Sequence, residues 1–307
     1  MTADMPPHIT AIADSAGVGQ FLSRQIETAE GTRTYKLFVP SGYDQRRPAP
    51  LLVVLHGCTQ DPDDISRGTR FNALAEQKGF LVAYPEQPQK YNALKCWNWF
   101  DAAHQVRAKG EPALIASIAQ RVMTDYSVDT KRIFIAGVSA GGAMALTVAY
   151  AYPELFAAAG IHSGIAYGSA TSIANALTAM RSGAADSSTL ASSVRNAMGS
   201  ARSFPAIVFQ GKADKSVNFI NAEQIVSQLS QAFVPPLTKL VEVTGEANGY
   251  HYRRRTVGSD KPYVEEWIVD ELGHAWSGGS KEGTYADPGG PDASSEMIRF
   301  FLENPRR

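Results

Sequence analysis

The sequence has 307 residues, of which 44% are hydrophobic and 19% charged, and its formal net charge is −1. This composition is typical of a globular protein with a sizeable core, and the near-zero charge excludes a global field that attracts nucleic acid or anionic membrane. No stretch is long and apolar enough to span a bilayer, and residues 1–20 lack the basic and apolar regions of a secretory signal peptide.

Strands and helices are predicted to alternate along the chain. In chain order we expect strands over 34–39 and 50–55, a helix over 65–78, a strand over 80–84, a helix over 113–126, a strand over 132–136, a helix over 142–149, strands over 156–161, 206–209 and 263–269, and a helix over 294–302. Continuous apolar strands joined by helices predict an α/β fold with a doubly wound, mostly parallel sheet. Residues 168–203, rich in Ser and Ala, predict a short insertion of helices and loops, either a cap or a plain surface connection.

Two groups of polar residues argue against other classes of site. Arg253, Arg254 and Arg255 lie in a strand-like run from Tyr250 to Val257, so their side chains alternate between faces and form no positive stripe. We favour a solvated edge strand over a phosphate site. The six histidines show no metal-ligand spacing, so we expect no metal and no cofactor.

The pentapeptide Gly137-Val138-Ser139-Ala140-Gly141 follows a predicted strand and precedes an apolar helix. A strand, then a sharp turn with a serine at its tip, then a helix is the arrangement typical of the nucleophile elbow of α/β-hydrolases. The glycines are expected because strand and helix pass closely at such a turn, and the helix N-terminus favours developing negative charge. We therefore predict residues 31–303 to be a single α/β-hydrolase catalytic domain, with residues 1–30 as an N-terminal extension.

A serine nucleophile needs a base, and the base needs a carboxylate to orient it. In this fold the chain order is Ser, acid, His. Asp214 follows the predicted strand over 206–209, and His274 follows the strand over 263–269, so Ser139, Asp214 and His274 are the predicted triad.

The rival residues are excluded by position. Asp270 lies only four residues before His274, too close to come from a separate strand end. Among the other histidines, His162 is expected to pack near the sheet edge and His251 lies among the arginines, whereas three precede the nucleophile: His8, His56 and His104.

An oxyanion hole needs backbone N–H groups aimed at the tetrahedral intermediate, and losing one donor typically costs roughly 3 kcal/mol. We expect one donor at Ala140 and the other at Cys58, in the loop after the strand over 50–55. His56 is interpreted as bracing this loop.

The chain has two cysteines, Cys58 and Cys96. Two free thiols are the default in a cytosolic enzyme, whereas a bridge would pin the oxyanion loop and, by loop entropy, stabilise the fold by about 4 kcal/mol. We favour the bridge.

Among the aromatic residues, Trp99, Tyr167 and Trp276 are candidate walls of a substrate groove, while core positions are preferred for Trp97 and Trp267.

Taken together, the motifs resemble those of the polyhydroxybutyrate (PHB) depolymerase family of esterases, which is related to feruloyl and acetylxylan esterases. The resemblance runs from about Tyr35 to Leu302 and rests on six segments: Leu55–Gln60, Tyr84–Gln87, Cys96–Phe100, Gly137–Gly142, Gly273–Gly279 and Gly289–Ala293. It implies the same triad, the Cys58 backbone as oxyanion donor, its bridge to Cys96, and an extracellular or periplasmic location.

The expected function is that of a serine carboxylesterase that forms an acyl-enzyme. Its partner is an ester substrate: hydroxyalkanoate oligomers or polyesters, or feruloyl or acetyl esters. Two alternatives stay open, a peptidase or acyltransferase of the same fold and a catalytically silent ligand-binding protein.

Overall fold

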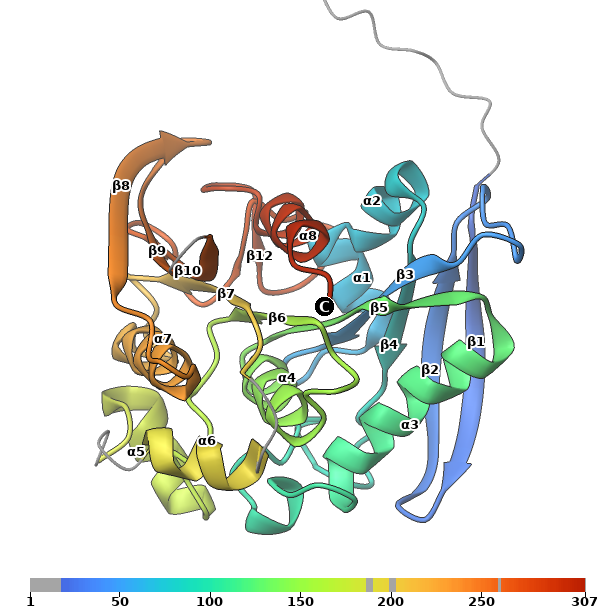
Figure 1. Cartoon of the computed structure of the whole chain (residues 1–307), viewed down its shortest axis with the longest axis horizontal. Helices are drawn as coiled ribbons and strands as arrows, with labels where there is room; N and C mark the ends of the chain where they lie inside the picture. Colours follow the sequence, from blue (N-terminus) through green and yellow to red (C-terminus); the bar gives the residue numbers. More distant parts are fainter. Residues whose placement is uncertain (1–17, 186–189, 199–202, 259–260, 307) are drawn as a thin grey trace, which may run out of the picture.

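The computed structural model of the chain describes residues 18–185, 190–198, 203–258 and 261–306. Its centre is a 10-stranded sheet in the order β1-β2-β4-β3-β5-β6-β7-β10-β9-β8 (Figure 1). The strands are β1 Gln20–Thr28, β2 Gly31–Val39, β3 Ala49–Leu55, β4 Leu81–Pro85, β5 Val128–Val138, β6 Ala158–His162, β7 Ala206–Gly211, β8 Lys239–Ala247, β9 Tyr250–Gly258 and β10 Pro262–Val269. Neighbours from β4 to β10 pair in parallel, and antiparallel strands flank them at both edges. The predicted doubly wound, mostly parallel sheet is confirmed.

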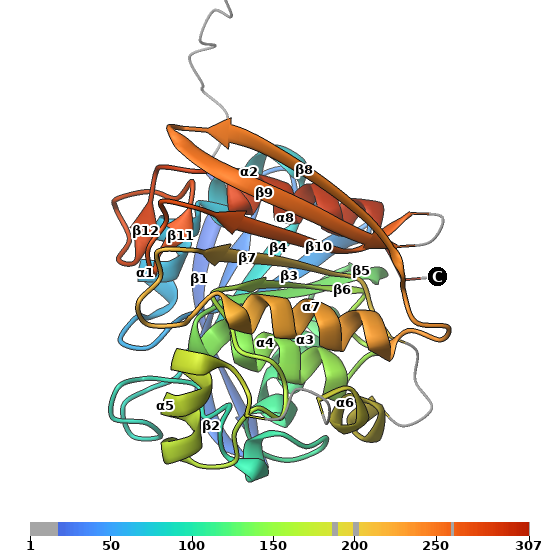
Figure 2. The same ribbon diagram turned by 90° about the vertical axis from the view of Figure 1, so that its left-hand side faces the viewer.

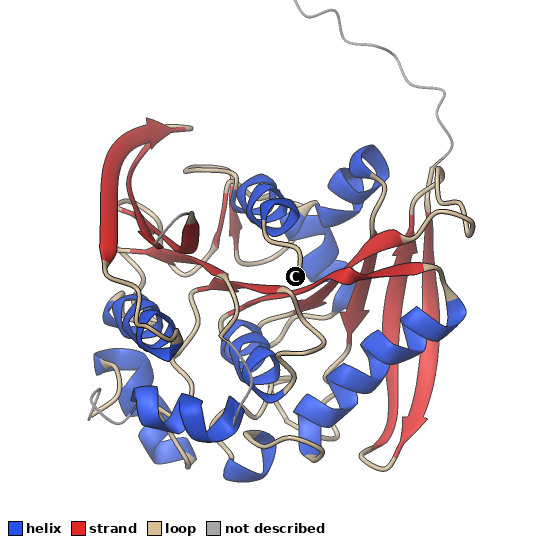
Figure 3. Cartoon of the chain, in the orientation of Figure 1, coloured by secondary structure: helices blue, strands red, loops and turns tan. Residues whose placement is uncertain are grey.

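Helices cover both faces of the sheet (Figure 3). On one face lie α1 Pro62–Thr69, α2 Phe71–Lys78 and α8 Ala293–Glu303; on the other lie α3 Gly110–Asp125, α4 Ala140–Ala151 and α7 Ile220–Ala232. Strand β3 is buried on both sides, because Leu52 and Val54 belong to the first hydrophobic layer and Leu51 and Val53 to the second. This explains why its sequence is continuously apolar rather than alternating.

The single helix predicted over 65–78 is wrong, because Arg70 divides it into α1 and α2. Arg70 has a left-handed backbone, with φ at 58°, and ends α1 with a hydrogen bond from its N–H to the Ser66 carbonyl. Its guanidinium donates to the Gly278 carbonyl and pairs with Asp292 at 2.7 Å. These distant partners stabilise a turn that nothing in the local sequence demands.

The predicted boundary at residue 30 is also wrong. Strand β1 pairs with β2 along its whole length, from Gln20 opposite Val39 to Thr28 opposite Gly31. The mixed polar sequence of β1 suits an edge strand, and Phe21 anchors it with an edge-to-face contact to Tyr84. The sheet therefore begins at Gln20, and residues 1–17 of the predicted extension lie outside the described residues.

Strand β9, which holds the three arginines, is not an edge strand. Strand β8 pairs outside it, and the two form a long antiparallel ribbon (Figure 2). Arg253 and Arg255 share one face with the carboxylates of Glu223, Glu242 and Glu266. On the opposite face Arg254 lies over the ring of Trp267, 5.3 Å from its centroid. Carboxylates thus compensate the charges of Arg253 and Arg255, whereas Arg254 makes a cation–π contact.

The insertion between β6 and β7 contains α5 Ile173–Ser182 and α6 Leu190–Met198, which lie outside the sheet beside α7 (Figure 2). The carbonyl of Met180 at the end of α5 accepts hydrogen bonds from Asn218 and Asn221, and Gln228 of α7 donates to the Leu190 carbonyl. Residues 186–189 and 199–202 of the predicted insertion lie outside the described residues. Its role as a cap stays a prediction.

No helix in the part of the chain that the structure describes has the length and apolarity to cross a membrane. Within the same residues, no cluster of His, Cys, Asp and Glu is arranged to hold a metal ion.

Candidate active site

The turn between β5 and α4 holds Ser139 in a strained backbone conformation, with φ at 57° and ψ at −123°. A Cβ on Gly137 would lie 2.3 Å from the Gly141 carbonyl oxygen, and one on Gly141 would lie 2.3 Å from that of Leu55. Only glycine fits at both positions. Strain of this kind costs of order 1–3 kcal/mol and persists where surrounding contacts impose it, here the buried helix α4 and the bond from Ser139 N–H to the His162 carbonyl.

The structure brings Ser139, His274 and Asp214 together at the carboxyl ends of parallel strands. Nε2 of His274 lies 3.0 Å from Ser139 Oγ, and its Nδ1 lies 2.7 Å from Asp214 Oδ2. The rival carboxylate, Asp270, instead pairs with Lys212 at the surface. The geometry is that of a nucleophile, a base and the carboxylate that orients the base.

Four hydrogen-bond donors surround the Asp214 carboxylate, which is fully buried. Oδ1 accepts from the backbone N–H groups of Ser216 and Val217, both at 2.8 Å, and Oδ2 accepts from Gln210 and His274. Burial by itself raises the pKa of Asp214, but the bond from His274 and the two N–H groups hold this pKa below its ordinary value. Asp214 is therefore an anion able to stabilise a positive imidazolium.

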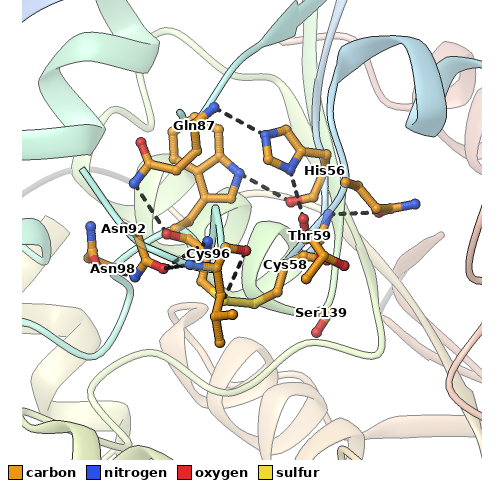
Figure 4. Close-up of a disulfide and its surroundings, with 12 residues drawn as sticks. His56, Cys58, Thr59, Gln87, Asn92, Cys96, Asn98 and Ser139 are labelled. Atoms are coloured by element: carbon orange, nitrogen blue, oxygen red, sulfur yellow. Dashed lines mark hydrogen bonds between the residues drawn. A yellow bond between two sulfur atoms is a disulfide. The ribbon is translucent and has the colours of Figure 1, made fainter. Parts of the chain in front are cut away.

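Two backbone N–H groups beside Ser139 donate to no acceptor in the described part of the chain. Ala140 is the first residue of α4, where helix geometry leaves the N–H unpaired. The N–H of Cys58 likewise donates to no group within the described ranges, whereas its neighbours Gly57 and Thr59 donate to Gln60 and Leu94. Figure 4 shows the Cys58 loop beside Ser139. These are the two predicted donors.

The predicted disulfide between Cys58 and Cys96 is confirmed (Figure 4). Polar contacts hold the Cys96 side of the bridge: the Cys96 N–H donates to Asn92, and Gln87 donates to the Cys96 carbonyl. The indole N–H of Trp97, which is fully buried, donates to the His56 carbonyl at 3.1 Å. The bridge therefore ties the oxyanion loop to a second, well-anchored segment.

His56 braces the oxyanion loop, in line with its predicted role. Nε2 accepts the N–H of Gln87 at 3.1 Å, so Nδ1 bears the proton and donates to the Gly57 carbonyl at 2.7 Å. Burial lowers the pKa of His56, which keeps the ring neutral. Beyond Gln87, the buried Glu111 accepts hydrogen bonds from Gln87 and Asn98, and burial raises the pKa of Glu111.

His162 does not lie near the sheet edge, and that prediction is wrong. It ends β6, a central strand, and its ring is stacked between Phe209 and Trp276. Nε2 accepts the N–H of Ser277 at 3.0 Å, and the carbonyl accepts the N–H of Ser139. One buried residue thus connects the nucleophile to the segment just after His274.

We predict that His162 makes the fold sensitive to acid. Burial, reinforced by the neighbouring His274, lowers the pKa of His162 to about 3, whereas histidine in the unfolded chain has a pKa near 6.5. Because the unfolded state binds the proton first, stability falls as the pH drops from 6.5 towards 3, by up to about 1.4 kcal/mol per pH unit. Urea unfolding at several pH values should give a shallower dependence for His162→Gln, even if that variant is less stable throughout.

The control for this experiment is His251→Gln. His251 is exposed, and its hydrogen bond to Glu271 raises the pKa of His251, so its removal should not make the acid dependence shallower. An unchanged slope in His162→Gln would contradict the assignment.

The three residues predicted to line a substrate groove differ in how far the structure agrees with that role. Trp276 is wrong as a wall residue: it is 1% exposed, contacts Phe71 and His162, and donates to Ser294. Its indole fills the core because β11, Trp276–Ser277, turns inward directly after His274. Trp99 is only 6% exposed and Tyr167 is half-buried with its hydroxyl bonded to the Gln105 carbonyl, so their roles stay predictions. Trp97 and Trp267 are core residues, as expected.

Sequence reasoning missed one aromatic residue at the site. Tyr285 precedes the short strand β12, Ala286–Asp287, which pairs with β11 and so carries Tyr285 beside His274. The only sequence signal is a lone aromatic residue in the glycine-rich segment between 278 and 290.

The family model described as Esterase PHB depolymerase matches residues 33–250. A curated relative, poly(3-hydroxyalkanoate) depolymerase C of Paucimonas lemoignei, is 28% identical over 92% of this chain and 66% of its own length. Feruloyl esterase B of Neurospora crassa is 31% identical over 53% of this chain and 56% of its own length. The chain thus spans just under two thirds, and about half, of these two relatives.

A solved structure, acetyl xylan esterase from Aspergillus awamori, has a similar fold, with a TM-score of 0.73 over 93% of this chain and 99% of that one. Their sequences are 22% identical.

Proposed function

Because the chain belongs to the Esterase PHB depolymerase family, we propose that it is a serine carboxylesterase in which Ser139, His274 and Asp214 are the catalytic triad. The observation that carries the proposal is the hydrogen-bonded series from Asp214 through His274 to Ser139, beside two unpaired N–H groups. A ligand-binding protein has no need of a strained serine that is bonded to a histidine oriented by a buried carboxylate.

In the proposed mechanism, His274 Nε2 takes the proton from Ser139 Oγ as this oxygen attacks the ester carbonyl carbon. The carbonyl oxygen becomes an anion held by the N–H groups of Cys58 and Ala140. The C–O bond to the alcohol then breaks, and His274 returns the proton to the leaving oxygen. Water, deprotonated by His274, attacks the acyl-enzyme in the same way and releases the acid.

Within carboxylic esters we propose hydroxyalkanoate oligomers as the preferred class. The support is the share of this chain that each relative matches. The poly(3-hydroxyalkanoate) depolymerase matches 92% of this chain, whereas the feruloyl esterase matches 53%. Feruloyl and acetyl esters are the second class.

The substrate proposal predicts a ranking by kcat/KM. A trimer of 3-hydroxybutyrate should be hydrolysed faster than methyl ferulate or acetylated xylan, with Ser139→Ala as the blank. Faster hydrolysis of either other ester would move the assignment to that class.

The two alternative activities of the same fold are tested alongside. Transfer of the acyl group to added methanol in preference to water would indicate an acyltransferase. Faster cleavage of acyl p-nitroanilides than of the matching p-nitrophenyl esters would indicate a peptidase.

We further propose that the protein acts outside the cytoplasm, in an extracellular or periplasmic location. The support is the Cys58–Cys96 disulfide, since such bridges persist in oxidising compartments. Fractionation of cells that express the full gene tests this, and recovery solely in the cytosol would contradict it.

A further inference from the structure

We propose that Tyr285 forms the wall of the site that contacts the leaving alcohol, and so helps to determine which alcohol the enzyme releases. This inference rests on the proposed function. Tyr285 is 50% exposed, and its ring stands edge-on to the ring of His274, with 6.3 Å between the centroids. Such an exposed aromatic face is a contact surface that the fold of the core does not require.

The position of Tyr285 beside His274 indicates which half of the ester it faces. His274 hands its proton to the leaving oxygen, so that oxygen must lie within hydrogen-bond reach of Nε2 when the C–O bond breaks. The acyl carbon, by contrast, is bound to Ser139 Oγ and its oxygen points towards Cys58 and Ala140. A side chain packed on His274 therefore contacts the alcohol rather than the acyl group.

A set of hydrogen bonds to α1 holds the Tyr285 segment firmly. The N–H of Thr284 donates to Asp64 Oδ1 at 2.8 Å, and the Thr284 hydroxyl donates to Asp64 Oδ2. On the other side of Tyr285, its carbonyl accepts the N–H of Trp276 at 2.7 Å. Tyr285 itself has a left-handed backbone, with φ at 50°, a conformation that a bulky residue adopts only where its surroundings impose it.

The same contacts extend to the oxyanion loop. Nε2 of Gln60 donates to Asp64 and to the Thr284 carbonyl, both at 3.0 Å, while its Oε1 accepts the N–H of Gly57 at 2.9 Å. Gln60 and Asp64 are both buried, at 3% and 9% exposure. The segment that carries Tyr285 is thus held at a fixed distance from the loop that carries the Cys58 N–H. The positioning residues are Gln60, Asp64 and Thr284. A wall held in this way is expected to discriminate between alcohols.

The test varies the alcohol while the acyl group stays constant. Wild type and Tyr285→Ala are compared on methyl, phenyl and 2-naphthyl acetate, and the ratio of the two kcat/KM values cancels the intrinsic reactivity of each ester. We expect Tyr285→Ala to lose about tenfold on the aryl acetates, in the range for a lost apolar contact, and less than twofold on methyl acetate. Tyr285→Phe should retain the aryl preference, because the ring makes the contact.

A second series varies the acyl group with p-nitrophenol as the constant alcohol. Tyr285→Ala should lower kcat/KM by the same factor on the acetate, butyrate and hexanoate, and should leave the deacylation rate constant unchanged, because the alcohol has departed by then. Tyr91→Ala, which removes an exposed tyrosine in contact with Arg33 and Lys90, is the matched control and should change none of these ratios.

Equal losses on methyl and aryl acetates would overturn the inference, since Tyr285 would then act only by supporting His274. A change in acyl preference would also overturn it, by placing Tyr285 on the acyl side. Failure of the wild type to hydrolyse any of these esters would instead overturn the proposed function, so the two failures are distinguishable.

Discussion

Replacing Ser139 by Ala should lower kcat/KM for p-nitrophenyl acetate by about 10⁶-fold, the order of the loss found when a triad nucleophile is removed. The hydroxyl supplies the attacking oxygen, and no other described hydroxyl lies against His274 Nε2. Alanine occupies the same strained backbone position as serine, so the fold should be retained. Initial rates, with circular dichroism and melting temperature to check folding, measure the effect.

The matched control is Ser117→Ala. The Ser117 hydroxyl donates to the Ala113 carbonyl within α3, far from the triad in the sequence, so its loss should leave the rate within twofold. A rate for Ser139→Ala within tenfold of wild type would contradict the assignment of the nucleophile.

Replacing Asp214 by Asn should lower kcat by about 10⁴-fold, the size of effect that a wrong histidine tautomer produces in a triad. An amide nitrogen facing Nδ1 of His274 favours the tautomer with its proton on Nε2. Nε2 of His274 then donates a hydrogen bond to Ser139 Oγ and can no longer accept its proton. Steady-state kinetics on p-nitrophenyl acetate measure the loss, and KM should change little because Asp214 is buried away from solvent.

Asp270→Asn is the control, because Asp270 is the aspartate that the sequence offers as a rival to Asp214. It pairs with Lys212 at the surface, so its replacement should change kcat less than twofold. If Asp270→Asn were the variant with the large loss, the roles assigned to the two aspartates would be reversed.

Reading the sequence was most successful where the structure depends on near neighbours. The elbow is a local feature: strand, glycine, serine, glycine and helix follow one another, and the close approaches at Gly137 and Gly141 involve that turn and the adjacent strand end. The chain order of acid and base then points to Asp214 and His274, because each follows a core strand whose carboxyl end lies at one edge of the sheet. The disulfide followed from there being only two cysteines, both in predicted site loops.

Positions set by distant contacts were missed or misjudged. Strands β1 and β8 have mixed polar sequences and exist because β2 and β9 pair with them, so the edge role assigned to the arginines was wrong. Trp276 was predicted to line a groove, yet its indole lies in the core against Phe71 and His162.

The sequence by itself determined the fold class, the elbow and the residues of the proposed triad, because glycine spacing, apolar runs and chain order are local properties. Only the tertiary structure placed His162 behind the site, with its ring against the segment after His274, and carried Tyr285 to the edge of that histidine. Both positions arise from pairing between segments far apart in the chain. Their energies come from burial and hydrogen bonds that exist only after folding.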